Sequence, residues 1–184
     1  MEIISTFNKS FSLTKFNLFL MTIINLMLEE LQHEAKTTRR MLDRVPFDRY
    51  DWKPHQKSMS LKNLATHIAE LPAWITMTLN TDELDFEAAP YTPTAVNSTK
   101  DLIELHDQNV TDAIAGLQAT NEEILEKPWI LRSGAKILSR STKLGTIRMS
   151  QCQIIHHRAQ LGVFLRLLDI PIPGSYGPSA DEPF

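Results

Sequence analysis

Two segments of the chain carry histidines among apolar residues and read as helices. His67 lies in Leu64–Glu70, and its spacing from the leucines at 64 and 71 turns the ring inward. His157 lies in the segment 153–161. Imidazole is the commonest protein metal ligand and carries protons near neutral pH. Because facing helices of a bundle can build a metal site in its core, these segments are the first candidates for chemistry.

Gln153 lies one helical turn before His157, where a further histidine would complete a metal site. Residues at i and i+4 share one face of a helix, and a His-x-x-x-His pair at this spacing is a metal clip. A glutamine offers only a neutral, hard amide oxygen there. Two interpretations stay open: a metal site made of His67, Gln153 and His157, or two histidines that are hydrogen-bonded core residues.

The neighbours of these residues have their own expected roles. His156 is rotated by about 100° from His157, so we expect it to face another helix or solvent. Arg158 is expected to pair with a carboxylate such as Glu70 or Glu34. Glu70, three residues after His67, is also a candidate to orient the His67 ring by a hydrogen bond.

The remaining histidines and the cysteine are weaker candidates. We expect His33 at a surface or boundary position, His55 in a loop and His106 on an exposed helix face. Cys152 is expected to be a small core residue, because nothing in the sequence shows an activating environment for a thiolate.

Apolar periodicity predicts four long helices that would position these residues. They are expected over residues 23–45, 60–80, 98–119 and 142–169. Ser60 and Ser98 are N-cap residues for the second and third helices. Pro72 falls inside the second helix and is expected to kink it one turn from His67.

The rest of the chain is predicted to connect these helices. Residues 81–97 form a long acidic connection, and 129–132 and 136–138 are two short extended pieces, too few for an independent sheet. The pattern therefore predicts an all-α fold, a four-helix bundle with a long crossover connection. After the last helix the prolines at 171 and 173 end the helical run, and Tyr176 is expected to pack back on the bundle.

Composition limits the class of protein. A chain of 184 residues with 42% hydrophobic and 22% charged residues is an ordinary globular domain. A net charge of −3 and scattered basic residues give no electrostatic case for nucleic acid. A single cysteine excludes a disulfide within the chain and the CxxC zinc modules, and favours a reducing, intracellular compartment.

The first residues are interpreted separately. The apolar run 16–28 contains Asn17, Thr22 and Asn25 and is too short to span a bilayer. The N-terminal segment has neither the basic start nor the small-residue cleavage site that a signal peptide requires. We therefore expect an N-terminal extension over residues 1–20, a main domain over residues 21–184, and no membrane partner.

Several segments in order resemble the DinB/YfiT-like metalloenzyme family, the DinB-like four-helix bundles. The resemblance covers residues 21–184 and rests on the segments 52–61, 64–74, 156–161 and 165–168 and on the tail Tyr176-Gly177-Pro178-Ser179 with Ala180-Asp181-Glu182. It implies an up-down-down-up bundle, commonly dimeric. Members of the family usually hold Ni or Zn with three histidines, one on helix two and two at i and i+4 on helix four. Characterised relatives include thiol-dependent S-transferases and a thiol-dependent maleylpyruvate isomerase.

Transferred to this chain, the resemblance implies a metal site at His67, Gln153 and His157, with glutamine in the place of the middle histidine. It implies a cytoplasmic homodimer, a divalent Ni or Zn ion, a low-molecular-weight thiol and a small electrophilic substrate. Two alternatives remain. The chain is a degenerate, non-catalytic member that binds a small molecule or partner, its metal lost through Gln153; or its histidines are structural and it acts through dimer-based interaction.

Overall fold

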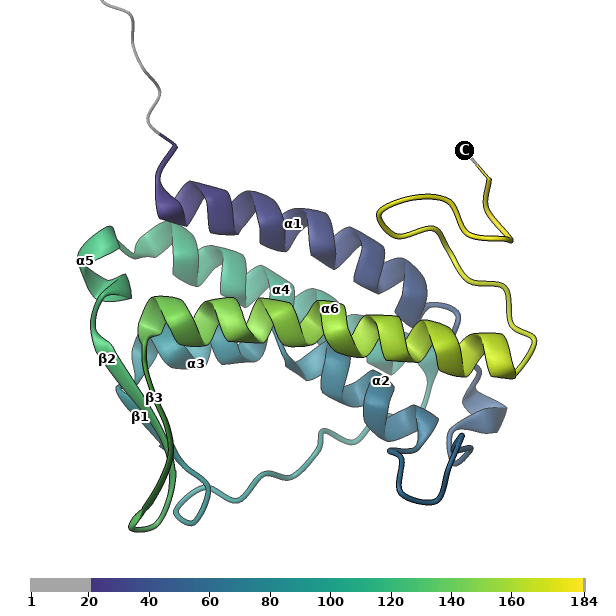
Figure 1. Ribbon diagram of the computed structural model, residues 1–184, viewed down its shortest axis with the longest axis horizontal. Helices are drawn as coiled ribbons and strands as arrows, with labels where there is room; N and C mark the ends of the chain where they lie inside the picture. The colour runs from purple at the N-terminus through teal and green to yellow at the C-terminus, as the bar shows by residue number, and fades with distance from the viewer. Residues whose placement is uncertain (1–20, 184) are drawn as a thin grey trace, which may run out of the picture.

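The computed structural model describes residues 21–183, so the expected extension over residues 1–20 lies outside the described part. The elements are α1 (Ile23–Leu42), the 3-10 helix η1 (Phe47–Arg49), α2 (Leu61–Glu70), α3 (Ala73–Asn80), β1 (Glu83–Asp85), α4 (Thr99–Ala119), α5 (Glu122–Leu125), β2 (Pro128–Ser133), β3 (Lys136–Thr142) and α6 (Lys143–Leu167). Figure 1 shows α1 and α6 running in one direction and α2, α3 and α4 in the other. The crossover from β1 to α4 passes below the bundle in that view.

Side-chain oxygens fix where the long helices begin. Ser60 Oγ accepts a hydrogen bond from Asn63 N at 3.2 Å, and Ser98 Oγ accepts one from Asp101 N at 3.0 Å. The Asp101 carboxylate in turn accepts hydrogen bonds from Asn97 N at 2.9 Å and from Ser98 Oγ at 2.7 Å, so it reaches back to the residues that begin α4. The predicted N-caps at Ser60 and Ser98 are confirmed.

The helix expected over residues 60–80 is two helices, α2 and α3, separated at Leu71 and Pro72. Proline has no amide hydrogen, so the helical ladder cannot continue through it. Neighbouring helices bond the carbonyls at the break: Asn109 Nδ2 of α4 donates to Ala69 O at 2.9 Å, and Ser150 Oγ of α6 donates to Leu71 O at 2.7 Å. The end of α2, and with it His67, is therefore held by two other helices.

The expected all-α fold is wrong, because residues 21–183 contain a three-stranded sheet in the order β1-β2-β3. The extended pieces near 129–138 form the antiparallel hairpin β2–β3, and β1 pairs with β2 in parallel, with Glu83 opposite Ile130. The third strand, β1, comes from the acidic connection, whose charged residues gave no strand pattern in the sequence. Arg132 on β2 pairs with Glu83 at 2.6 Å and with Asp85 at 2.7 Å, so those acidic residues become cross-strand partners.

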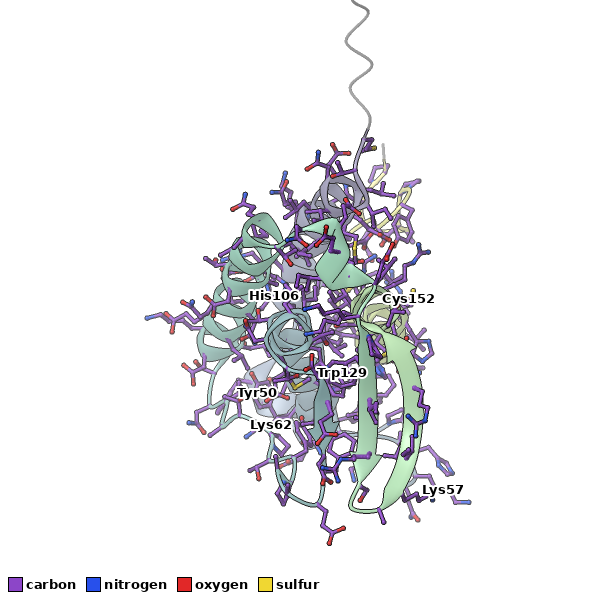
Figure 2. The ribbon with its side chains drawn as sticks, turned by 90° about the vertical axis from the view of Figure 1, so that its left-hand side faces the viewer. Tyr50, Lys57, Lys62, His106, Trp129 and Cys152 are labelled. Atoms are coloured by element: carbon purple, nitrogen blue, oxygen red, sulfur yellow. The ribbon has the colours of Figure 1, made fainter. Side chains whose placement is uncertain are left out.

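Trp129 attaches the sheet to the helices. Its side chain is 2% exposed and lies on the side of the hairpin that faces the helices (Figure 2). The indole Nε1 donates to Thr81 Oγ1 at 3.2 Å, and the ring centroid lies 6.4 Å from that of Trp74 on α3. The sheet is thus anchored to α3 and to the residue that follows it.

Replacement of Trp129 by alanine is expected to destabilise the fold by about 3–5 kcal/mol, because it removes a buried indole and leaves a cavity. Urea denaturation followed by circular dichroism measures this change. The control is Ile137→Ala on β3, a side chain that is 41% exposed, for which a change within about 0.5 kcal/mol is expected. Equal losses in the two variants would show that the hairpin is not anchored through Trp129.

Candidate metal site

A buried ion pair fixes how α6 is rotated about its own axis. The Arg158 side chain is 3% exposed and its guanidinium bonds the Glu34 carboxylate of α1, which is 7% exposed. The same group donates to Thr38 Oγ1 at 3.1 Å and to Ser175 Oγ at 3.1 Å. Of the two expected partners of Arg158, Glu34 is therefore the correct one. Because successive residues of a helix are about 100° apart, His157 is turned away from α1 when Arg158 faces it.

His157 lies beside His67 of α2. The two ring centroids are 4.9 Å apart and the rings are inclined by 72°. Both side chains are half-buried. The two histidines chosen from the sequence are thus brought together, on segments about 90 residues apart in the chain.

Gln160 is a site residue that the sequence reasoning missed. Its Oε1 lies 2.9 Å from His157 Nδ1, and its Nε2 lies 3.1 Å from His156 Nε2. An amide oxygen can only accept, so in this arrangement His157 carries its proton on Nδ1 and keeps the Nε2 lone pair for a ligand. The signal was present, because Gln160 follows the two histidines by three and four residues on one helix.

The environment of His67 favours its neutral form. Burial lowers the pKa of this imidazole, and electrostatic interaction with the adjacent His157 ring lowers it further, while Glu70 raises it. A neutral ring offers a lone pair to a metal ion at neutral pH, as a ligand must.

Gln153 is half-buried on α6, one turn before His157. Within residues 21–183 no three His, Cys, Asp or Glu side chains are placed to hold a metal ion together. The candidate donors are therefore two imidazoles, which lie side by side, and the amide of Gln153, which is one helical turn from His157. Two donors of this set suit Zn or Ni, and the third is a weaker ligand for them.

Glu70 has a different role from the one expected. Its carboxylate accepts hydrogen bonds from Tyr91 OH at 2.6 Å and from Thr94 N and Oγ1, both at 2.7 Å. These bonds tie the crossover to the end of α2. Glu70 thus holds a loop in place rather than hydrogen-bonding the ring of His67.

The C-terminal tail packs back on the bundle, as predicted, but on the α1 side of α6. Tyr176 OH donates to Glu34 Oε1 at 2.9 Å, and the tyrosine ring lies 5.4 Å from the Arg158 guanidinium carbon. Ion pairs Arg166–Asp181 and Arg40–Glu182 hold the rest of the tail. A cavity of about 620 Å³ between the tail and α6 is lined by neither His67 nor His157. The tail therefore supports the buried ion pair and does not border the histidine pair.

Two expectations about single residues are wrong. Cys152 is exposed rather than in the core. His106 is 2% exposed rather than on an open helix face, and Figure 2 shows it within the helical layer. The spacing carried the signal for His106, since it lies four residues after Leu102 and seven before Ala113, both buried on α4. The exposed position of Cys152 follows from the rotation of α6 that Arg158 imposes.

Replacement of Arg158 by methionine is expected to cost about 3–5 kcal/mol of stability, because the buried Glu34 carboxylate is left without a positively charged partner. The control is Arg39→Met, which removes an exposed pair with Asp107 and is expected to cost about 0–1 kcal/mol. Chemical denaturation of both variants at pH 7 makes the comparison. Similar losses would mean that the Arg158 pair behaves as a surface pair.

Stability is expected to fall as the pH drops below the ordinary histidine range, with His106 as one cause. Burial lowers the pKa of His106 in the folded state, and the adjacent Asp107, 3.1 Å from its Nδ1, only partly offsets this. The unfolded chain then binds more protons than the folded one below a pH of about 6.5, so acid favours unfolding. Denaturation at several pH values should show a smaller loss in His106→Gln than in wild type. The variant His33→Gln, at an exposed position, should keep the full loss; a full loss in His106→Gln as well would refute the assignment.

Comparison with known proteins agrees with the fold described above. A DinB-like protein (YjoA) from Bacillus subtilis is 18% identical, with a TM-score of 0.64 over 87% of this chain and 100% of that one. A DinB-like protein from Bacillus cereus is 18% identical, with a TM-score of 0.63 over 82% and 95% of the two chains. A further member of this group from Exiguobacterium sibiricum is 19% identical, with a TM-score of 0.57 over 81% and 94%. These identities establish similarity of fold alone.

A search of curated proteins gives no match. In the described part of the chain no helix is both long and apolar enough to cross a membrane. The sequence matches the DinB family over residues 15–183, nearly the whole chain. The chain therefore belongs to the DinB family.

Proposed function

We propose that His67, Gln153 and His157 hold a divalent metal ion, and that this ion serves a reaction between a low-molecular-weight thiol and a small electrophile. One observation carries the proposal. The rings of His67 and His157 lie 4.9 Å apart, and Gln160 bonds His157 Nδ1, which leaves Nε2 free to act as a ligand.

The donor set supports Zn or Ni as the ion. Both ions accept imidazole nitrogen readily, and an incomplete protein ligand set leaves a position for water or an external thiol. A bound divalent ion lowers the pKa of a thiol that coordinates it, which supplies a nucleophilic thiolate at neutral pH. In this scheme His67 remains neutral because of its burial, and Gln160 keeps the ring of His157 oriented.

Gln153 favours a second candidate function, a DinB protein that has lost its metal and binds a small molecule or a partner without catalysis. An amide in place of a third imidazole weakens the site for Zn and Ni. Metal affinity decides between the two candidates. A homodimer and a cytoplasmic location remain predictions for either of them.

Titration of untagged wild-type protein with Zn and Ni is expected to show weak binding. The Gln153→His variant is expected to bind these ions at least about tenfold more tightly. The geometry from residue 153 to residue 157 already suits a pair of ligands, so a third imidazole completes the set. Binding by both proteins should weaken as the pH falls through the histidine range, because protons compete for the ring nitrogens.

The matched control is Gln108→His, which adds a histidine at an exposed position on α4 and should bind as wild type does. The variants His67→Gln and His157→Gln should lose binding. If Gln153→His and wild type bind metal equally, or if neither binds, the site is not formed by these three residues.

Activity separates the two candidates further. Metal-loaded wild type is expected to consume a small thiol together with a small electrophile, and Gln153→His is expected to do so at lower metal concentration. Thiol loss above the rate with metal alone is the measurement. No thiol consumption by either protein, with metal bound, would favour the non-catalytic alternative.

A further inference from the structure

A second cavity, of about 310 Å³, lies between α3, α4, the β1 segment and the crossover. We call it the crossover pocket. Its lining side chains are mostly apolar or aromatic: Glu70, Ala73, Trp74, Met77, Leu84, Phe86, Ala89, Tyr91, Thr94, Leu105 and Asn109. Its volume is at the small end of the usual range for ligand pockets, so it suits a ligand of few atoms.

The charge of the pocket comes from one residue. Glu70 is the charged side chain among those that line it, and no ion pair within residues 21–183 involves Glu70. Hydrogen bonds from Tyr91 OH, Thr94 N and Thr94 Oγ1 occupy three of the roughly four acceptor positions of a carboxylate. All three bonds are donated to the carboxylate, and no basic residue lines the pocket to balance its charge.

Three aromatic rings share this pocket with the carboxylate. Trp74 comes from α3, Phe86 follows β1, and Tyr91 belongs to the crossover. The faces of aromatic rings attract cations, and aromatic pockets of this kind recognise alkylated ammonium groups. Partial burial and the adjacent Glu70 raise the pKa of Tyr91, which is 56% exposed, so its hydroxyl stays protonated and continues to donate to the carboxylate.

We propose that the crossover pocket binds a small alkylated ammonium cation, with the positive head among Trp74, Phe86 and Tyr91 and its charge balanced by Glu70. The Glu70 carboxylate would repel an anion. A neutral ligand would leave the negative charge of Glu70 unbalanced. The pocket forms without any metal ligand among its lining residues, so this proposal is independent of the proposed metal site.

The hydrogen bonds of Glu70 also have a structural role, because they tie the crossover to α2. Glu70→Gln keeps the shape of the side chain and removes its charge, so it tests the electrostatic part directly. Phe86→Leu keeps an apolar side chain of similar size and removes one ring, which tests the aromatic part without touching the tie. Glu104→Gln, an exposed position on α4, is the matched control.

The probes are choline and its neutral isostere 3,3-dimethylbutan-1-ol, titrated into protein treated with EDTA and followed by tryptophan fluorescence and by NMR. Choline is expected to bind wild type at least about tenfold more tightly than the neutral isostere. Glu70→Gln and Phe86→Leu should each weaken choline binding, and Glu70→Gln should reduce the difference in affinity between the two probes to what the aromatic rings alone provide. Glu104→Gln should bind both probes as wild type does.

Equal affinity for the two probes in wild type would overturn the proposal, as would undiminished choline binding in a folded Phe86→Leu protein. If Glu70→Gln does not fold, the Phe86→Leu comparison decides. Because the protein is free of metal throughout, failure here leaves the metal titrations unaffected, and failure of those titrations leaves this result unaffected.

Discussion

The buried contact between Arg158 and Glu34 is the interaction on which most of the described structure depends. A long helix can rotate about its axis at little cost when both of its faces are apolar, and α6 carries apolar side chains around much of its circumference. A buried guanidinium and a buried carboxylate allow one rotation only, because any other leaves a charge without a partner. That rotation places His157 beside α2 and Cys152 at the surface.

The break between α2 and α3 works with this constraint. Pro72 interrupts the backbone ladder, and side chains from α4 and α6 take up carbonyls at the break. Ser150 makes one of these bonds, two turns before His157 on the same helix. The distance between the two histidines is thus set by polar contacts on both sides, and not by apolar packing alone.

Much of this arrangement could be predicted from local patterns. Ser60 and Ser98 predicted the starts of their helices, and Pro72 predicted a kink where the structure has a break. The inward spacing of His67, with the i to i+4 spacing and the family resemblance at His157, indicated the pair that the fold brings together. Local patterns could not show contacts between residues that are far apart in the sequence. The strand β1 pairs in parallel with β2, and Arg132 of β2 neutralises its carboxylates. The helical spacing of His106 and Gln160 agrees with where they lie, but the packing of α1 against α4 and the rotation of α6 decide which face of each helix is covered. In each case the deciding partner is remote in sequence, or its relevance depends on how a helix is rotated.

The parallel pairing of β1 with β2 has a consequence for the order in which the chain folds. The hairpin β2–β3 closes a short loop and can form early, whereas β1 must wait until α4 and α5, which lie between the paired strands, are in place. The three residues of β1 then complete the sheet late, and they are a natural place for the native protein to open first. Since the crossover follows β1 directly, local opening of β1 is expected to loosen the contacts that the crossover makes with Glu70.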